Sequence, residues 1–201
     1  MSVLFEISNR VARVTLNRPE RMNAVDAATE EALEAVWREI EARDDISCVV
    51  LTGAGEKAFS AGADLKSGSG KSGLDYWAFA RPSGFGGIAF RPSLDMPVIA
   101  RVNGFALGGG FEMVLGCDIV IASDNAKFGL PEARVGRMPL DGGMILLQRK
   151  IPFNQAMGVA DDKGMVTVFF ELNGQPRRIK VPDRAGSFRQ TRWHVSASST
   201  R

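Results

Sequence analysis

The chain has 201 residues, 45% of them hydrophobic and 24% charged, which suits a globular protein with one sizeable core. The formal net charge of +2 is too small to indicate a nucleic-acid-binding protein, and no apolar run approaches the roughly 20 residues that a membrane helix needs. One histidine, His194, and two cysteines, Cys48 and Cys117, argue against a histidine-based catalytic set, a zinc site and a disulfide framework.

These counts predict a protein of a reducing compartment in which carboxylates carry out any proton transfer. The first residues, MSVLFEISNR, lack the basic start and the apolar block of a signal peptide, so we expect a cytoplasmic location. We also expect no metal centre, no membrane partner and no nucleic-acid partner.

The first elements in chain order are two short apolar-rich runs, Val3–Ser8 and Val11–Leu16, which predict a β-hairpin. Residues 26–43 predict an amphipathic helix, because apolar residues recur there at helical spacing: Leu33, Val36, Trp37 and Ile40. Residues 47–52 are nearly all apolar and predict a strand buried on both faces. Residues 53–87 are rich in Gly, Ser and Ala and predict a long irregular region.

The central part of the chain alternates strands with a helix. Residues 97–102 predict a strand, the segment after Gly108-Gly109-Gly110 predicts a helix, and residues 118–122 predict a second buried strand. This order indicates an α/β architecture.

The C-terminal part differs in charge and composition. Residues 1–158 hold 17 basic and 19 acidic residues, whereas residues 159–201 hold 8 basic and 4 acidic residues, and we place a boundary at Gly158. Residues 165–172 and 175–181 predict a hairpin through Asn173-Gly174, since Asn-Gly between β-type runs is the strongest short hairpin signal. Residues 185–201 show no periodicity and predict disorder. The predicted domains are therefore 1–158, 159–184 and a basic tail, 185–201.

One glycine motif is discounted. Residues 53–58 match the pattern GxGxxA after a predicted strand, with Asp75 further along, which outlines a dinucleotide-binding fingerprint. That motif should open a helix, but here it runs into another glycine-containing turn at residues 59–64. We therefore expect no nicotinamide site.

Two other segments rich in small residues cover residues 58–65 and 103–112. Small residues let a ligand approach the backbone, and a glycine-rich turn that enters a helix presents unpaired N–H groups. Two such N–H groups from separate segments can hold a developing oxyanion, although tight turns without a ligand explain the same composition.

These segments also carry a family resemblance. Three motifs in order, AFSAGADL, NGFALGGGFEMVLGCDIVIAS and KFGLPEARVGRMPLDGG, resemble the crotonase (enoyl-CoA hydratase/isomerase) family over residues 3–158. The resemblance implies a fold of spiralling ββα units. It also implies that the backbone N–H groups of Ala63 and Gly109 form an oxyanion hole for the carbonyl of an acyl-CoA thioester.

The resemblance further implies which side chains act on the substrate. Glu112, after the Gly-Gly-Gly turn, and Glu132, after Pro131, match the two glutamates of the hydratases, and we expect the helix N-terminus to lower the pKa of Glu112 while burial raises that of the other carboxyl group. Asp141 is assigned no role. The groove for coenzyme A is expected to involve Arg21, Ala24, Ala61, Gly62, Ala63, Asp64 and Leu65.

The chain departs from the family after residue 158. The family's long C-terminal helical region, which helps to build oligomers, is expected to be missing, so any homo-oligomer should be altered. Residues 154–184 instead resemble a stretch of pyruvate carboxylase that carries no biotinylation motif and no active site, and no function is transferred from it.

Three functions compete on this evidence. The first is an enoyl-CoA hydratase that uses an acyl-CoA thioester and no cofactor beyond the coenzyme A of its substrate. The second is an enoyl-CoA isomerase or another crotonase activity, in which Glu132 alone could move a proton. The third is a catalytically impaired acyl-CoA-binding remnant. Residues 174–201 hold seven basic residues and one acidic residue, but a solvated tail explains them without a nucleic-acid partner.

Overall fold

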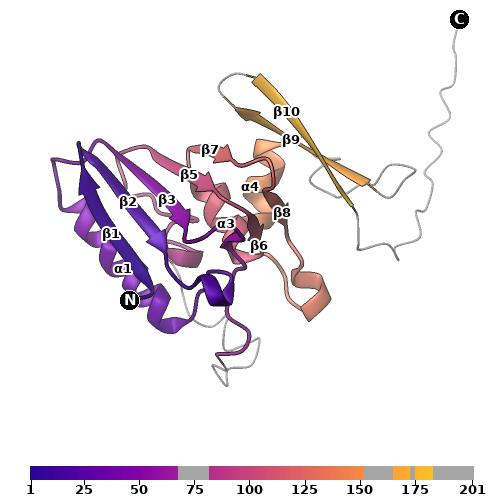
Figure 1. Ribbon diagram of the computed structural model, residues 1–201, viewed down its shortest axis with the longest axis horizontal. Coiled ribbons are helices and arrows are strands. Elements are labelled where there is room, and N and C mark those ends of the chain that lie inside the picture. The colour runs from indigo at the N-terminus through magenta and orange to yellow at the C-terminus, as the bar shows by residue number, and fades with distance from the viewer. Residues whose placement is uncertain (68–81, 152–164, 173–174, 183–201) are drawn as a thin grey trace, which may run out of the picture.

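The computed structural model describes residues 1–67, 82–151, 165–172 and 175–182. Its main body has a larger mixed sheet, with helices on one side, and a smaller parallel sheet (Figure 1). The larger sheet has the order β1-β2-β3-β5-β7, formed by Val3–Ser8, Val11–Leu16, Cys48–Gly53, Val98–Val102 and Ile119–Ala122. The pair β1–β2 is antiparallel, and the other neighbours are parallel. The smaller sheet is parallel, with the order β4-β6-β8, formed by Ala58–Ser60, Phe105–Leu107 and Lys127–Gly129.

The described helices are α1 (Ala27–Glu41), α3 (Gly109–Gly116) and α4 (Gly143–Lys150), with short 3-10 turns at Pro19–Arg21, Phe85–Gly87 and Glu132–Val135. The chain repeatedly places one strand in the larger sheet, the next in the smaller sheet and then a helix, as in β5–β6–α3 and β7–β8–α4. The described fold therefore has the α/β architecture with repeated ββα units that we expected from the sequence.

The β1–β2 hairpin turns on two residues in the left-handed region. Asn9 has φ of 51° and Arg10 has φ of 66°, the backbone that a two-residue type I′ turn requires. The predicted helix at residues 26–43 is confirmed as α1, which begins after Asp26. The carboxylate of Asp26 accepts a hydrogen bond of 2.8 Å from the Thr29 N–H and so caps the helix.

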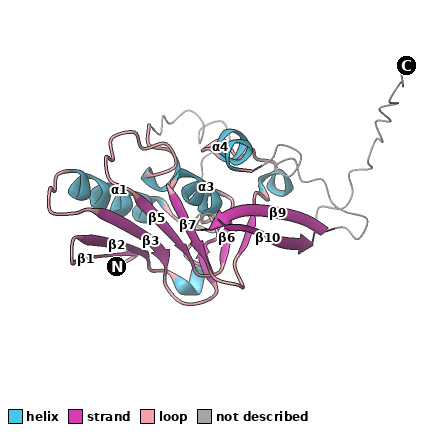
Figure 2. Ribbon diagram, turned by 90° about the horizontal axis from the view of Figure 1, so that it is seen from above, coloured by secondary structure: helices cyan, strands magenta, loops and turns pink. Residues whose placement is uncertain are grey.

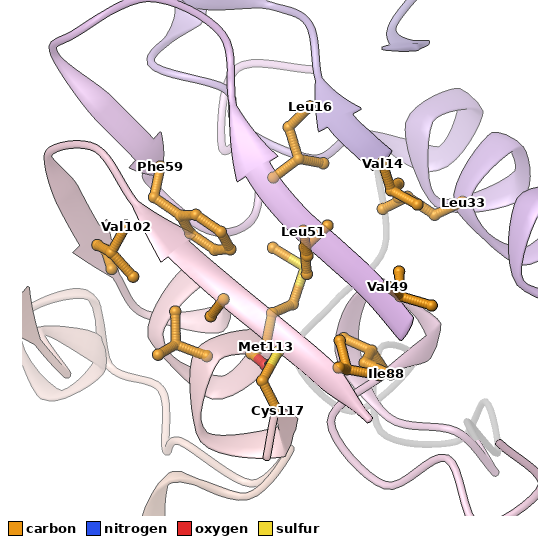
Figure 3. Close-up of a cluster of buried hydrophobic side chains, with 14 of the residues drawn as sticks. Val14, Leu16, Leu33, Val49, Leu51, Phe59, Ile88, Val102, Met113 and Cys117 are labelled. Atoms are coloured by element: carbon orange, nitrogen blue, oxygen red, sulfur yellow. The ribbon is translucent and has the colours of Figure 1, made fainter. Parts of the chain in front are cut away.

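The core lies between the larger sheet and the two helices on one of its faces (Figures 2 and 3). Alternate residues of β3, such as Val49 and Leu51, are buried against α1 and α3, from which Leu33 and Met113 contribute. Val50 of the same strand is only half-buried. Thr52, on the same face as Val50, is 5% exposed, so the expectation that this strand is buried on both faces holds only toward its C-terminal end.

The prediction of a buried strand at residues 118–122 is wrong in its burial. The strand β7 forms there, but it stands at the edge of the sheet, and Ile119 and Ile121 are each 46% exposed. An apolar run in sequence does not distinguish a central strand from an edge strand.

The predicted C-terminal hairpin is confirmed. Strands β9 (Met165–Leu172) and β10 (Gln175–Pro182) pair antiparallel, with Leu172 opposite Gln175. The Asn173-Gly174 turn and the predicted disordered tail lie outside the described residues.

The irregular region predicted at residues 53–87 contains two short elements in its described part, β4 and the 3-10 turn Phe85–Gly87. The GxGxxA motif leads from β3 into β4 and opens no helix, so the structural context of a dinucleotide site is absent from this part of the chain.

Candidate active site

The two segments of small residues meet at the N-terminus of α3. Gly62 has φ of +82°, and a methyl group added to it would lie 2.8 Å from the Leu107 carbonyl oxygen and 2.9 Å from the Gly109 nitrogen. A methyl group added to Gly110 would overlap the Ser60 carbonyl group. Glycine at both positions therefore lets the loop after β4 approach the first turn of α3 at backbone distance.

This approach brings the Ala63 and Gly109 segments together. The residues on either side of Ala63 pair with Val25: the Val25 N–H donates to the Gly62 carbonyl oxygen over 2.8 Å, and the Asp64 N–H donates to the Val25 carbonyl oxygen over 2.9 Å. Within the described part of the chain, no acceptor takes a hydrogen bond from the Ala63 N–H or the Gly109 N–H. Both N–H groups thus remain available to a ligand.

Glu112 lies in the first turn of α3 and is 3% exposed. Its Oε1 accepts a hydrogen bond of 2.9 Å from the Gly143 N–H, which belongs to the first turn of α4. Burial, together with the negative charges of Asp141 and Glu132, raises the pKa of Glu112 to about 7, although hydrogen bonds from the backbone N–H groups of Gly143 and Asp141 oppose that shift.

The expectation that the helix N-terminus lowers the pKa of Glu112 is therefore wrong. The cost of removing this carboxylate from water exceeds the favourable interaction with the helix dipole, which is worth about 0.3–1 kcal/mol. The charge of Asp141, which was assigned no role from the sequence, adds to the shift.

Glu132 lies beside Gly108, at the N-terminus of α3. A methyl group added to Gly108, the residue that precedes α3, would lie 3.2 Å from Glu132 Oε1. Burial raises the pKa of Glu132, and its Oε2 is buried with no hydrogen-bond partner among the described residues. Two carboxyl groups with raised pKa values therefore flank one helix terminus.

The loop at residues 18–24 packs against the same region through Asn23, which is 1% exposed and has φ of 54°. Its Nδ2 donates to the carbonyl oxygens of Ala54 and Ala58 over 3.0 and 2.8 Å. The hydroxyl group of Ser60 donates to the Asn23 carbonyl oxygen over 2.8 Å. This network ties the loop to β4 and to the Ala61–Gly62 turn.

Of the residues expected to line a coenzyme A groove, Asp64 has partners within the protein. Its carboxylate, 4% exposed, forms ion pairs with Arg18 over 3.0 Å and with Arg21 over 3.6 Å. Burial would raise the pKa of Asp64, but the Lys66 N–H and the two arginines together bring it below its ordinary range. Ala24 is buried, whereas Leu65 is 59% exposed.

Arg18, Asn23 and Gly143 were missed by sequence reasoning. Arg18 holds Asp64 and Asp26 with one nitrogen atom and the Ala24 carbonyl oxygen with another. A single arginine, asparagine or glycine in a polar loop carries no periodic or spacing signal, so only the fold identifies these contacts.

Among the described residues, no three His, Cys, Asp or Glu side chains gather in a way that could hold a metal ion. No helix in the same residues is long and apolar enough to cross a membrane.

Known proteins are similar to this chain in sequence. The family model for enoyl-CoA hydratase/isomerase matches residues 6–163. The chain is 43% identical over 159 residues to an (E)-benzylidenesuccinyl-CoA hydratase of Thauera aromatica, covering 78% of this chain and 60% of that protein. It is 38% identical over 184 residues to a probable enoyl-CoA hydratase of Rhizobium meliloti (strain 1021), covering 91% and 70%.

A solved structure is similar as well. The carnitinyl-CoA dehydratase from Mycobacterium avium 104 superposes with a TM-score of 0.70 at 38% identity, covering 88% of this chain and 64% of that one. The chain thus spans less than two thirds of the length of several relatives that it matches.

The resemblance of residues 154–184 to pyruvate carboxylase is not borne out, and the domain boundary at Gly158 stays a prediction. A family match over most of the chain, with this fold, shows that the protein belongs to the enoyl-CoA hydratase/isomerase family.

Proposed function

We propose that the protein is an enoyl-CoA hydratase, which adds water across the 2,3 double bond of an acyl-CoA thioester. The observation that carries this proposal is the meeting of four groups at the N-terminus of α3. The N–H groups of Ala63 and Gly109 have no acceptor in the described residues, and the carboxyl groups of Glu112 and Glu132 flank the same helix end.

The two N–H groups suit the role of an oxyanion hole. When water attacks C3, electron density moves through C2 to the thioester oxygen, which becomes an enolate oxygen. Two fixed N–H donors stabilise that charge without reorganisation, and the loss of one donor of this kind typically costs about 10²–10³-fold in turnover. The positive end of α3 acts in the same direction.

The two carboxyl groups suit the proton transfers. One, ionised, accepts a proton from the attacking water, while the other, protonated, delivers a proton to C2, so that the sum is one added water. Burial raises the pKa of both carboxyl groups, and the charge of Glu132 raises that of Glu112 further, so one group can hold a proton while the other is ionised. The Gly143 N–H, which donates to Glu112 Oε1, fixes the position of this carboxyl group.

The reaction moves protons and water only, so we expect no metal or redox cofactor. The substrate partner is an acyl-CoA thioester. Arg21, Ala24 and the Ala61–Leu65 loop are proposed to lie along its coenzyme A part.

The test is the hydration of a short enoyl-CoA, followed as the loss of absorbance of the conjugated thioester, together with calorimetry of coenzyme A ester binding. Turnover that Glu132→Gln abolishes supports the hydratase. Migration of a double bond without addition of water selects an isomerase, and binding without turnover selects the impaired remnant.

A second candidate follows from the similarity to a carnitinyl-CoA dehydratase. Dehydration of a 3-hydroxyacyl-CoA is the reverse of the same step and uses the same groups. Assays in both directions with 3-hydroxyacyl and enoyl thioesters would show which substrates the chain accepts.

A further inference from the structure

Residues 83–91 form a bridging segment between α1 and α3. Residues 84–89 are buried, and glycines at 84, 86 and 87 have φ values of +67°, +63° and +69°. Only glycine adopts such a run of left-handed conformations without strain. The backbone of this segment therefore passes in close contact between the two helices.

On the α3 side, the bridging segment follows the helix along its length. A methyl group added to Gly109 would lie 2.6 Å from Cδ1 and Cε1 of the Phe85 ring, so the ring rests directly on Gly109. A methyl group added to Gly86 would overlap the Met113 sulfur, and one added to Gly116 would lie 2.6 Å from the Ile88 carbonyl oxygen. Gly109, Met113 and Gly116 are spaced along one helix face.

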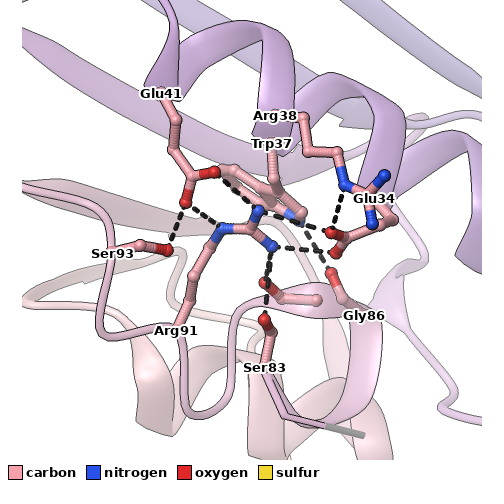
Figure 4. Close-up of polar contacts among 9 residues, drawn as sticks. Glu34, Trp37, Arg38, Glu41, Ser83, Gly86, Arg91 and Ser93 are labelled. Atoms are coloured by element: carbon pink, nitrogen blue, oxygen red, sulfur yellow. Dashed lines mark hydrogen bonds and ion pairs between the residues drawn. The ribbon is translucent and has the colours of Figure 1, made fainter.

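On the α1 side, the segment is held by side chains of α1 and by Arg91 (Figure 4). The Trp37 Nε1–H donates to the Gly86 carbonyl oxygen over 2.8 Å. The Arg91 guanidinium pairs with Glu34 over 2.8 Å and with Glu41 through two nitrogen atoms, and it also donates to the Gly87 carbonyl oxygen over 3.1 Å. Glu34 and Glu41 are two helical turns apart and face the same side.

The arginine cannot be replaced in kind by lysine. The Arg91 side chain is 3% exposed, and its five donors, fixed in one plane, reach two carboxylates and a carbonyl group at once. A lysine ammonium group is a point donor on a flexible stem and could satisfy only part of this set. Loss of the full set would free the bridging segment from α1 without removing any residue near the substrate.

We propose that Arg91 is a positioning residue for the Gly109 N–H: by fixing the bridging segment to Glu34 and Glu41, it holds the Phe85 ring against Gly109 and so sets the direction of one donor of the oxyanion hole. This inference rests on the proposed function of Gly109. Arg91 acts through Phe85 and touches no reacting atom.

The experiment compares Arg91→Lys with Arg43→Lys, a matched control because Arg43 also forms a two-nitrogen pair with a carboxylate, that of Asp45, on the exposed surface. The readouts are kcat, KM and the red shift of an aryl-conjugated enoyl-CoA on binding, which reports polarisation of the thioester carbonyl. Arg91→Lys should lower kcat about 10- to 100-fold with little change in KM, and should reduce the red shift, because a small displacement of a donor has that effect. Arg43→Lys should match the wild type.

Phe85→Leu serves as the second variant, since it leaves the ion pairs intact. It should reduce the red shift similarly, and the double variant should lose little more than the larger single loss, because both act on one donor. A folded Arg91→Lys with wild-type kcat and red shift would overturn the proposal. If Arg91→Lys does not fold, an unchanged red shift in Phe85→Leu would overturn it.

A wild-type protein that neither hydrates nor polarises the probe would instead refute the proposed function. Amide hydrogen exchange in residues 105–116 then tests whether Arg91 holds the bridging segment against α3. Faster exchange there in Arg91→Lys than in Arg43→Lys supports that role of Arg91, and equal exchange contradicts it.

Discussion

The Gly143 N–H donates a 2.9 Å hydrogen bond to Glu112 Oε1, so the start of α4 holds a carboxylate that α3 carries. The contact tolerates no side chain at residue 143, because an added methyl group would lie 2.6 Å from Pro139 Cβ and 3.0 Å from Leu130 Cδ1. The orientation of one proposed catalytic residue therefore depends on how two helices meet.

Replacing either glutamate by glutamine tests the proposed acid–base pair. Glu132→Gln and Glu112→Gln should each lower kcat about 10²–10⁴-fold, as expected for the loss of a general acid–base. The double variant should lose less than the product of the single losses, because groups that act as a unit are not additive. Binding of coenzyme A esters, measured by calorimetry, should survive all three changes, since the proposed oxyanion contacts are backbone groups.

Glu31→Gln is the control for these variants. Glu31 lies on the exposed face of α1, so its substitution should leave kcat unchanged. Full activity in Glu132→Gln would rule out the assignment.

The raised pKa of Glu112 predicts how stability depends on pH. In the unfolded chain Glu112 loses its proton near its ordinary value of 4.5, whereas in the folded protein it keeps the proton up to about 7. Between these values the folded state binds more protons, so this group makes the free energy of unfolding fall as the pH rises, by on the order of 3 kcal/mol, and the fall levels off once the pH exceeds the folded-state pKa.

Urea unfolding of the wild type and of Glu112→Gln at several pH values measures this effect. The stability of the variant relative to the wild type should increase from about pH 4.5 to about pH 7 and then level off, because glutamine carries no charge to bury. A difference independent of pH would show that the burial of Glu112 is not accompanied by a raised pKa.

The sequence predicted those helices and strands that residues close together along the chain determine. Apolar residues at helical spacing predicted α1, and Asn-Gly predicted the β9–β10 hairpin. The strands β4, β6 and β8 have three residues each, which is too short for periodicity to be recognised, and they were not predicted.

The electrostatics of the site depended on partners distant in sequence. The pKa of Glu112 is set by burial and by groups at residues 132, 141 and 143, none of which is near it along the chain. The helix dipole was visible in the sequence, but its stronger competitor, desolvation, becomes visible only when the neighbours are placed.

Asn23 offers a test of the loop that borders the proposed coenzyme A groove. Asn23→Asp removes the two donors to the Ala54 and Ala58 carbonyl oxygens and places a carboxylate oxygen against them in a buried position. The free energy of unfolding should fall by about 3 kcal/mol, because buried acceptors lose their partners and a charge is buried.

Denaturant unfolding measures this loss. Asn125→Asp is the control, because Asn125 is exposed, and such a surface substitution should change stability by no more than about 0.5 kcal/mol. Equal stabilities for the two variants would mean that the buried network contributes little.

Gly109→Ala tests whether the contact with Phe85 controls the proposed oxyanion donor. The substitution keeps the N–H group and should even favour the helix by about 1 kcal/mol on intrinsic propensity. The added methyl group, however, would lie 2.6 Å from the Phe85 ring, so the ring or the helix terminus must move. We therefore expect kcat to fall about 10- to 100-fold while the protein stays folded, because a displaced donor binds the transition state poorly.

Gly129→Ala is the matched control. The nearest neighbour of its added methyl group would be the flexible Leu107 Cδ2 at 3.4 Å, and its activity should be close to that of the wild type. Adding Phe85→Leu to Gly109→Ala removes part of the ring that blocks the methyl group and should recover stability lost to the clash. If Gly109→Ala is as active as Gly129→Ala, the position of the Gly109 N–H does not limit the reaction.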